Sequence, residues 1–172
     1  KAGRESPYFF NAGNFSTGAA TSQLCRLYAT TILASNLGQT ALYGPAYKGI
    51  PLASGVAAKL SELGGLDLPF IYNRKEPKDH GEGGDLVGPP LAGQKVLIID
   101  DVISAGTSVR ESFNLITAAG ATPVGVIVAL DRQERGSGDL SAVQEVQQTY
   151  GIPVLAIATL ENLVQYLGDK AE

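Results

Sequence analysis

The chain of 172 residues has no methionine and no tryptophan, and it carries one cysteine, Cys25, and one histidine, His80. A lone thiol cannot form an internal disulfide. Cys25 lies beside Leu24 in a segment with helical spacing, so we interpret it as a core residue. This cysteine usage favours a reducing cytoplasm. No Cys–His or Ser–His–Asp nucleophile is evident, so covalent catalysis by such a group is not expected.

Long apolar runs and an excess of positive charge are also absent. No run approaches the roughly 20 residues that cross a membrane, so we expect no membrane partner. Lys and Arg number 13 against 17 Asp and Glu, a formal net charge of −4. This balance argues against a molecule covered by a nucleic-acid-binding surface, although it leaves room for a local basic patch. Because methionine is missing even at the first position, we expect an element to precede Lys1 in the natural protein.

The composition, with 44% hydrophobic and 17% charged residues, is typical of a globular chain, and the length predicts a single domain over residues 1–172. Apolar runs alternate with segments of helical spacing, which predicts an α/β fold with a mainly parallel central sheet flanked by helices on both faces. The expected strands are Tyr8–Asn11, Ala41–Tyr43, Leu68–Tyr72, Lys95–Val102, Thr122–Leu130 and Pro153–Thr159. The expected helices are Thr21–Leu37, Ile50–Leu63, Thr107–Ala119, Leu140–Tyr150 and Glu161–Leu167.

Val96–Ser108 is the most informative segment of the chain. An apolar strand ends in two adjacent carboxylates, Asp100 and Asp101, and continues through the small residues 104–106 into the helix Thr107–Ala119. Small residues let backbone N–H groups approach a phosphate, and the helix N-terminus adds a partial positive charge. Carboxylates at the carboxyl end of a strand lie where open α/β sheets bind ligands. The pattern therefore predicts a phosphate-binding site beside two acids, against the alternative of an ordinary acidic turn.

Gly44–Gly49 forms a second candidate site after the expected strand Ala41–Tyr43. The glycines and Pro45 indicate a tight loop with backbone donors, and Lys48 adds one positive charge next to Tyr47. Such a loop suits an anion that leaves during a reaction. Alone, the segment is better read as a plain strand–helix connection, but its place at the same sheet edge as the two acids favours a site.

Residues 73–94 are mostly glycine, proline and charged residues without periodicity. Arg74, Lys75, Lys78 and His80 lie within seven residues of one another. Structureless loops of this length are typically lids, binding loops or disordered segments. We interpret residues of about 75–88 as a mobile lid whose cations neutralise a polyphosphate while the closed loop excludes water, against the alternative of a solvated flexible segment.

Two further features could contact a flat or acidic acceptor. Arg132 follows the strand Thr122–Leu130 and could make a bidentate contact to a carboxylate or planar acceptor, against the alternative of a surface ion pair with Glu134 or Asp131. Phe9 and Phe10 could stack on a ring, but in isolation such aromatics are more often core residues.

Together these segments resemble the type I phosphoribosyltransferases. Val96–Ser108 is similar to the 5-phosphoribosyl 1-pyrophosphate (PRPP) signature of that family. Within the family, the chain resembles the orotate phosphoribosyltransferase branch over nearly its whole length, through Lys1–Asn11, Gly44–Pro51, Asn73–Gly84 and Leu130–Gly136. The resemblance implies the type I fold with a mobile catalytic loop and a small hood. It also implies Mg²⁺-dependent, reversible transfer of 5-phosphoribose from PRPP to orotate, giving orotidine 5′-monophosphate and pyrophosphate.

The resemblance also implies roles for individual residues. Lys75, Lys78, His80, Asp100 and Asp101 would be catalytic, with the two acids addressing the ribose hydroxyls. Orotate would be contacted by Lys1, Phe9, Phe10 and Arg132, and the pyrophosphate end by Tyr47 and Lys48, with Arg74 completing the site. The 5′-phosphate loop would comprise Val102, Ile103, Ser104, Ala105, Gly106, Thr107 and Ser108. Mg²⁺ would be held mainly through PRPP, and a homodimer would share active sites across its interface.

The chain departs from the family pattern in two places. The helices that usually precede the position of Lys1 are missing, and Ser104 stands where many relatives carry threonine, which keeps the hydroxyl. Other interpretations are a purine or uracil phosphoribosyltransferase, which would share the acid pair, and a non-catalytic PRPP-binding regulator. The retained Lys75, Lys78 and His80 and the acidic net charge disfavour the regulator.

Overall fold

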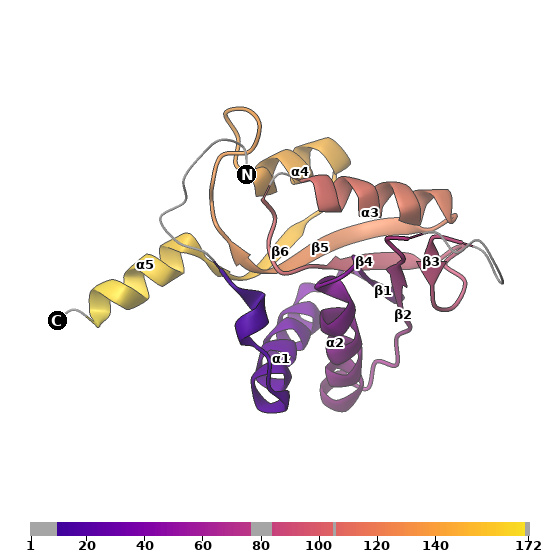
Figure 1. The fold of residues 1–172 in the computed structure, drawn as a ribbon, viewed down its shortest axis with the longest axis horizontal. Coiled ribbons are helices and arrows are strands. Elements are labelled where there is room, and N and C mark those ends of the chain that lie inside the picture. The colour runs from indigo at the N-terminus through magenta and orange to yellow at the C-terminus, as the bar shows by residue number, and fades with distance from the viewer. Residues whose placement is uncertain (1–9, 77–83, 105, 171–172) are drawn as a thin grey trace.

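Six strands form one sheet in the order β3-β2-β1-β4-β5-β6 in the computed structural model, which describes residues 10–76, 84–104 and 106–170. The strands are β1 (Ala41–Gly44), β2 (Phe70–Asn73), β3 (Leu86–Val87), β4 (Lys95–Ile99), β5 (Thr122–Asp131) and β6 (Val154–Thr159). The helices are η1 (Ala12–Asn14), α1 (Gly18–Ser35), α2 (Gly49–Gly64), α3 (Thr107–Ala118), α4 (Ala142–Tyr150) and α5 (Leu160–Asp169). In Figure 1, α1 and α2 cover one face of the sheet, α3 and α4 cover the other, and α5 extends away from β6.

Strand direction decides where the loops meet. Every neighbouring pair is parallel except β2 and β3. The carboxyl ends of the five parallel strands therefore lie at one edge, and the loops that follow β1, β2, β4 and β5 leave the sheet there. These are the loops in which the sequence places its candidate site residues.

Successive residues of the central strands belong to two separate hydrophobic cores, because side chains alternate between the two faces of a sheet. Val96 and Ile98 of β4 pack with residues of α3 and α4, whereas Leu97 and Ile99 pack with residues of α1 and α2. All four side chains are fully buried. The central strand is thus apolar on both faces, as its continuous hydrophobic run predicts, and it fixes the place at which Asp100 and Asp101 follow.

The predicted α/β class, with a mainly parallel sheet between helical layers, is confirmed. Several predicted boundaries are wrong. β4 ends at Ile99, and Val102 only bridges to Leu130, because the two acids use their own side chains to bond the backbone there. α1 begins at Gly18 rather than Thr21, since Thr17 caps it. The short strand β3 was not predicted. Of the predicted strand Tyr8–Asn11, the described residues 10 and 11 are irregular.

In the described parts of the chain, no helix is both long enough and apolar enough to traverse a lipid bilayer.

Candidate active site

Asp100 and Asp101 follow β4 at the carboxyl edge of the sheet, and both are 7% exposed. The N–H of Asp101 donates to Oδ1 of Asp100 at 2.9 Å, and the N–H of Val102 donates to Oδ1 of Asp101 at 2.8 Å. The hydroxyl of Ser108, in the first turn of α3, donates to the other carboxylate oxygen of Asp100 at 2.9 Å. These bonds fix the direction of both carboxylates relative to the start of α3.

Burial controls the proton affinity of Asp100. Removal from water raises the pKa of Asp100 to about 6, and the charge of Asp101 acts in the same direction. The hydrogen bonds from the Asp101 N–H and from Ser108 oppose this rise. Asp100 therefore changes its charge just below neutral pH, which is typical of a functional carboxylate.

The N-terminus of α3 faces a cavity of about 310 Å³. Its N-cap is Gly106, with φ of 67°, a conformation that favours glycine, and no side chain caps the helix. The first-turn amides of α3 are thus left for a ligand. Seven of the predicted site residues line the cavity, namely Lys75, Val102, Ile103, Ser104, Gly106, Thr107 and Ser108, together with Ala46, the chain neighbour of Tyr47.

The loop after β1 closes the other side of the cavity. A Cβ on Gly49 would lie 2.6 Å from Pro45 Cδ, so this tight turn requires glycine. The peptide bond between Ala46 and Tyr47 is cis. The Asn73 side chain, at the end of β2, accepts a 2.7 Å hydrogen bond from the Ala46 N–H. The end of β2 thereby holds the loop that carries Tyr47 and Lys48.

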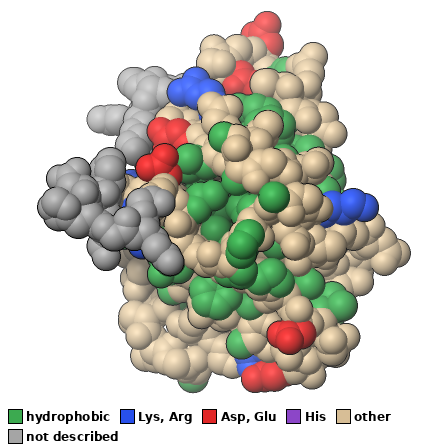
Figure 2. Space-filling model, turned by 90° about the vertical axis from the view of Figure 1, so that its right-hand side faces the viewer, with side chains coloured by type: hydrophobic (Ala, Val, Ile, Leu, Met, Phe, Trp, Pro, Cys, Tyr) green, Lys and Arg blue, Asp and Glu red, His purple; other side chains and the backbone are tan. Residues whose placement is uncertain are grey.

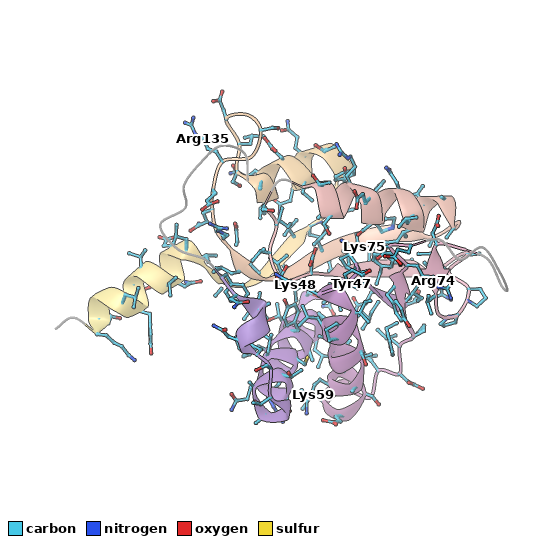
Figure 3. The ribbon with its side chains drawn as sticks, in the orientation of Figure 1. Tyr47, Lys48, Lys59, Arg74, Lys75 and Arg135 are labelled. Carbon is cyan, nitrogen blue, oxygen red and sulfur yellow. The ribbon has the colours of Figure 1, made fainter. Side chains whose placement is uncertain are left out.

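Three predicted cationic and aromatic residues meet at this edge. Lys48 Nζ lies 3.4 Å from Asp101 Oδ2, and Lys75 Nζ lies 5.4 Å from the centre of the Tyr47 ring. Figure 3 shows the three labelled side chains close together between the helical layers, far from Lys59 on α2. The structure thus brings the loop after β1, the start of the loop after β2 and the acid pair into one site.

Other predicted residues lie apart from the cavity. The Arg74 guanidinium donates to the Gly84 carbonyl at 3.1 Å, across the loop between β2 and β3. Arg132 pairs with Glu134 at 2.7 Å, the interaction that the sequence offered as the alternative to a binding role. The Phe10 ring centre lies 6.3 Å from that of Phe15, and Phe10 packs against the α1–α2 core.

Five predicted site residues, Lys1, Phe9, Lys78, His80 and Ala105, lie outside the described residues. Their roles, and those of the described site residues, stay predictions.

Sequence reasoning missed several polar side chains that support the site. Tyr28 donates to the Asp100 carbonyl at 2.7 Å, and Asn73 binds the loop after β1. Buried Ser112 donates to the Ser108 carbonyl at 2.7 Å. The Ser112 contact lies within α3, one turn of the helix apart, whereas no local pattern marks the contacts of Tyr28 and Asn73, because they depend on how distant elements pack.

The acid pair offers ligands that suit Mg²⁺. Asp101 Oδ2 is buried and accepts no hydrogen bond from the described residues, although it faces the Lys48 ammonium at 3.4 Å, and two carboxylates stand side by side. The described residues contain no group of three or more Asp, Glu, His or Cys that could hold a metal alone. Mg²⁺ usually binds one or two carboxylates together with substrate phosphates. The residues therefore fit a Mg²⁺ ion held partly by a phosphate substrate.

Comparison with known proteins decides the family. A profile of the family described as "Phosphoribosyl transferase domain" matches residues 12–155. Orotate phosphoribosyltransferase of Nitrosospira multiformis is 64% identical over 99% of this chain and 74% of its own, and that of Chromobacterium violaceum is 63% identical over 100% and 79%. The chain belongs to the orotate phosphoribosyltransferase family. The crystal structure of the Francisella tularensis orotate phosphoribosyltransferase is similar throughout, with a TM-score of 0.87 and 41% identity over 98% of this chain and 81% of its own.

Membership of the orotate phosphoribosyltransferase family agrees with the resemblance found in the sequence and disfavours the purine, uracil and regulatory alternatives. It also indicates which chemical groups the edge of the sheet where α2 and α3 begin would bind. An enzyme of this kind handles two phosphate-bearing ends of one sugar, and the structure has two helix N-termini without side-chain caps beside its acid pair.

Proposed function

We propose that this protein transfers 5-phosphoribose from PRPP to orotate, giving orotidine 5′-monophosphate and pyrophosphate in pyrimidine biosynthesis. The observation that carries the proposal is the buried pair Asp100–Asp101 between the uncapped N-termini of α2 and α3. A ribose flanked by two phosphate groups matches this arrangement, with its hydroxyls toward the acids, one phosphate toward the start of α3 and the other toward the loop that precedes α2.

The two ends of PRPP are assigned by the loops. The amides at the start of α3 and the hydroxyls of Ser104, Thr107 and Ser108 suit the 5′-phosphate, since this loop lines the cavity. The loop of Tyr47 and Lys48 suits the pyrophosphate, because it places the Lys48 cation beside the acid pair.

Breaking the bond at the anomeric carbon builds positive charge on the sugar and negative charge on the leaving pyrophosphate. Asp100 and Asp101 place negative charge beside the ribose. Lys48 and Lys75 place positive charge beside the leaving group, and we assign Lys78 and His80 to the same task by resemblance. No residue has to act as a nucleophile.

We further propose Mg²⁺ as the cofactor. Asp101, whose Oδ2 is buried without a hydrogen bond in the described structure, and Asp100 would hold it together with PRPP. When bound, the ion supplies neutralisation of the pyrophosphate charge.

We propose that the active form is a homodimer with shared active sites. Figure 2 shows the side of the molecule that carries β3, where hydrophobic side chains gather and charged ones lie mostly at the margins. Leu66, in the connection from α2 to β2, is 36% exposed. The connection between β2 and β3 starts and ends on this side, and by resemblance a second copy would receive its loop. An apolar patch of this kind suits a partner surface. The lone buried thiol, Cys25, supports a cytoplasmic location.

The central test is release of pyrophosphate from PRPP by the purified protein. We expect release only when both orotate and Mg²⁺ are present, with uracil, hypoxanthine and adenine as control bases. Release with a control base but not with orotate would contradict the proposal.

The shared site has its own test. Two variants with strongly reduced turnover alone, Lys78→Ala in the loop and Asp101→Asn at the acid pair, are mixed and allowed to exchange subunits, and we expect activity to rise. Sedimentation velocity gives the oligomeric state in the same buffer. An active monomer, or no recovery in mixtures shown to have exchanged, would contradict the shared site.

A further inference from the structure

Tyr28 lies in the middle of α1 and is fully buried, yet it reaches the acid pair. Its hydroxyl donates a 2.7 Å hydrogen bond to the main-chain carbonyl of Asp100, 72 residues away in the sequence. No substrate can touch a residue with no exposed surface, so any effect of Tyr28 on the reaction acts through Asp100.

The carbonyl that Tyr28 binds belongs to the peptide unit between the two acids. The N–H of the same unit, that of Asp101, donates to Oδ1 of Asp100. The main-chain groups on either side of this peptide unit bind β5. The Asp100 N–H donates to the Ile127 carbonyl, and the Asp101 carbonyl accepts from the Ala129 N–H. The peptide unit between the acids is therefore held at both ends by side chains, and its plane sets the directions in which both carboxylates leave the chain.

The Tyr28 hydroxyl is suited to act as a permanent hydrogen-bond donor. Burial raises the pKa of Tyr28, and the charges of Asp101 and Asp100 raise it further. The hydroxyl therefore stays protonated beside the acids over the range in which enzymes work. A buried carbonyl without a partner is costly, so loss of this bond would be relieved by rotation of the peptide unit.

We propose that Tyr28 is a positioning residue that aims the Asp100–Asp101 pair at the ribose of PRPP. The inference rests on the proposed role of the acids in binding PRPP. It adds a residue from the far side of the sheet, on a helix that carries none of the assigned site residues. Because misplacement of a reacting group by about 1 Å can cost on the order of 100-fold in rate, a small rotation would be measurable.

The test compares Tyr28→Phe with Ile32→Val. Phenylalanine removes only the hydroxyl. Ile32 lies one turn further along α1, is 1% exposed and packs in the same core, so its variant reports loss of stability alone. For Tyr28→Phe we expect the KM for PRPP to rise about tenfold and kcat to fall, with less than a twofold change in the KM for orotate. For Ile32→Val we expect both KM values to stay unchanged. A KM does not depend on the fraction of active enzyme, so partial unfolding of either variant leaves the comparison valid.

A third variant, Asp101→Asn, separates the two proposals. If it raises the KM for PRPP and Tyr28→Phe does not, the role of Tyr28 is overturned and the role of the acids stands. If Asp101→Asn leaves the KM for PRPP unchanged, the assignment of the acids fails and the inference falls with it. Equal changes in the KM for PRPP and for orotate in Tyr28→Phe would show general damage to the site and would also overturn the inference.

Discussion

The five α-helices of the described structure begin in two different ways. Thr17, Ser141 and Thr159 cap α1, α4 and α5 with their side chains, and the last two form complete capping boxes. Lys48 and Gly106 precede α2 and α3 and provide no such hydrogen bond. The two uncapped helices are those that follow the proposed pyrophosphate loop and the proposed 5′-phosphate loop.

The presence or absence of a side-chain cap distinguishes helix starts that stabilise the fold from helix starts at the proposed ligand site. A capping side chain satisfies amides at the start of a helix and contributes about 1 kcal/mol. A helix whose first amides bind a phosphate cannot use the same amides for a cap. α2 and α3 therefore forgo a side-chain cap. At the start of α2 the N–H groups of Gly49 and Ile50 donate to the Pro45 and Tyr47 carbonyls, and Pro51 has no N–H, so it is the first-turn amides of α3 that stay open beside the acid pair. If this division is right, changes at α2 and α3 should affect PRPP, and changes at the capped helices should affect only folding.

The largest effect is expected at the side chain next to the start of α2. Lys75→Ala removes a positive charge beside Tyr47 and Lys48, so the leaving pyrophosphate loses part of its neutralisation. We expect turnover to fall by about 100-fold or more, with PRPP binding largely kept. Steady-state kinetics and equilibrium binding measure the two quantities.

Lys59→Ala is the matched control for Lys75→Ala. Lys59 lies on α2, where it pairs with Glu62 at 2.9 Å, distant from the site in Figure 3. We expect its kinetics to equal those of the wild type. Unchanged turnover in Lys75→Ala would contradict the role proposed for this residue of the lid.

Asp100, between the two helix ends, should weaken the fold as it ionises. Burial raises the pKa of Asp100 from 3.8 to about 6. Between these values the folded state binds a proton that the unfolded chain has already released, so the stability from this group is present at acid pH and is lost as pH rises toward 6. Asp100→Asn should therefore raise the free energy of unfolding at pH 7 by up to about 3 kcal/mol, with little change near pH 4, while PRPP binding is lost.

Urea unfolding of both proteins between pH 4 and pH 7 measures this difference. An asparagine variant that is less stable than the wild type at pH 7 would show that the ionised carboxylate stabilises the fold, contrary to the prediction.

The sequence predicted the parts of this site that follow one another in the chain. The start of the apolar strand at Lys95 and the start of α3 at Thr107 are local features and were predicted correctly, whereas the predicted end of that strand at Val102 was wrong. The capping boxes Ser141–Gln144 and Thr159–Asn162 also have a readable pattern. The predicted starts of α4 and α5 nevertheless differ from the structure by one or two residues.

Contacts between distant segments could not be predicted in the same way. The bond from Tyr28 to Asp100 exists because α1 packs beneath β4, and the bond from Ala46 to Asn73 exists because β1 lies beside β2. Helical spacing marks Tyr28 as a buried residue but says nothing of what its hydroxyl reaches. Strand order is a property of the whole chain, so these supports became visible only with the fold.

A charge added at an uncapped helix end should act oppositely on folding and on binding. Thr107→Glu places a carboxylate in the first turn of α3, which should stabilise the helix by about 0.3–1 kcal/mol. The same charge would repel the 5′-phosphate by about 2 kcal/mol at roughly 8 Å and an effective dielectric constant of about 20, or roughly 30-fold in affinity. Isothermal titration with PRPP and urea unfolding measure the two effects.

Asn162→Glu adds the same charge to the first turn of α5 and keeps a residue suited to the capping box. We expect no change in PRPP affinity. Equal losses of affinity in Thr107→Glu and Asn162→Glu would point to net charge rather than to the start of α3.

The smallest effect is expected at a capped helix. Ser141→Ala removes the hydroxyl that accepts from the Gln144 N–H at 3.1 Å, which should lower the free energy of unfolding by about 1 kcal/mol. The KM for PRPP and kcat should stay at wild-type values, because the amides at the start of α4 already serve the fold alone. Chemical unfolding and steady-state kinetics on the same preparation test this. If Ser141→Ala keeps its stability but loses PRPP affinity, the start of a capped helix takes part in binding. That result would contradict the assignment of ligand binding to uncapped helices and of stability to capped ones.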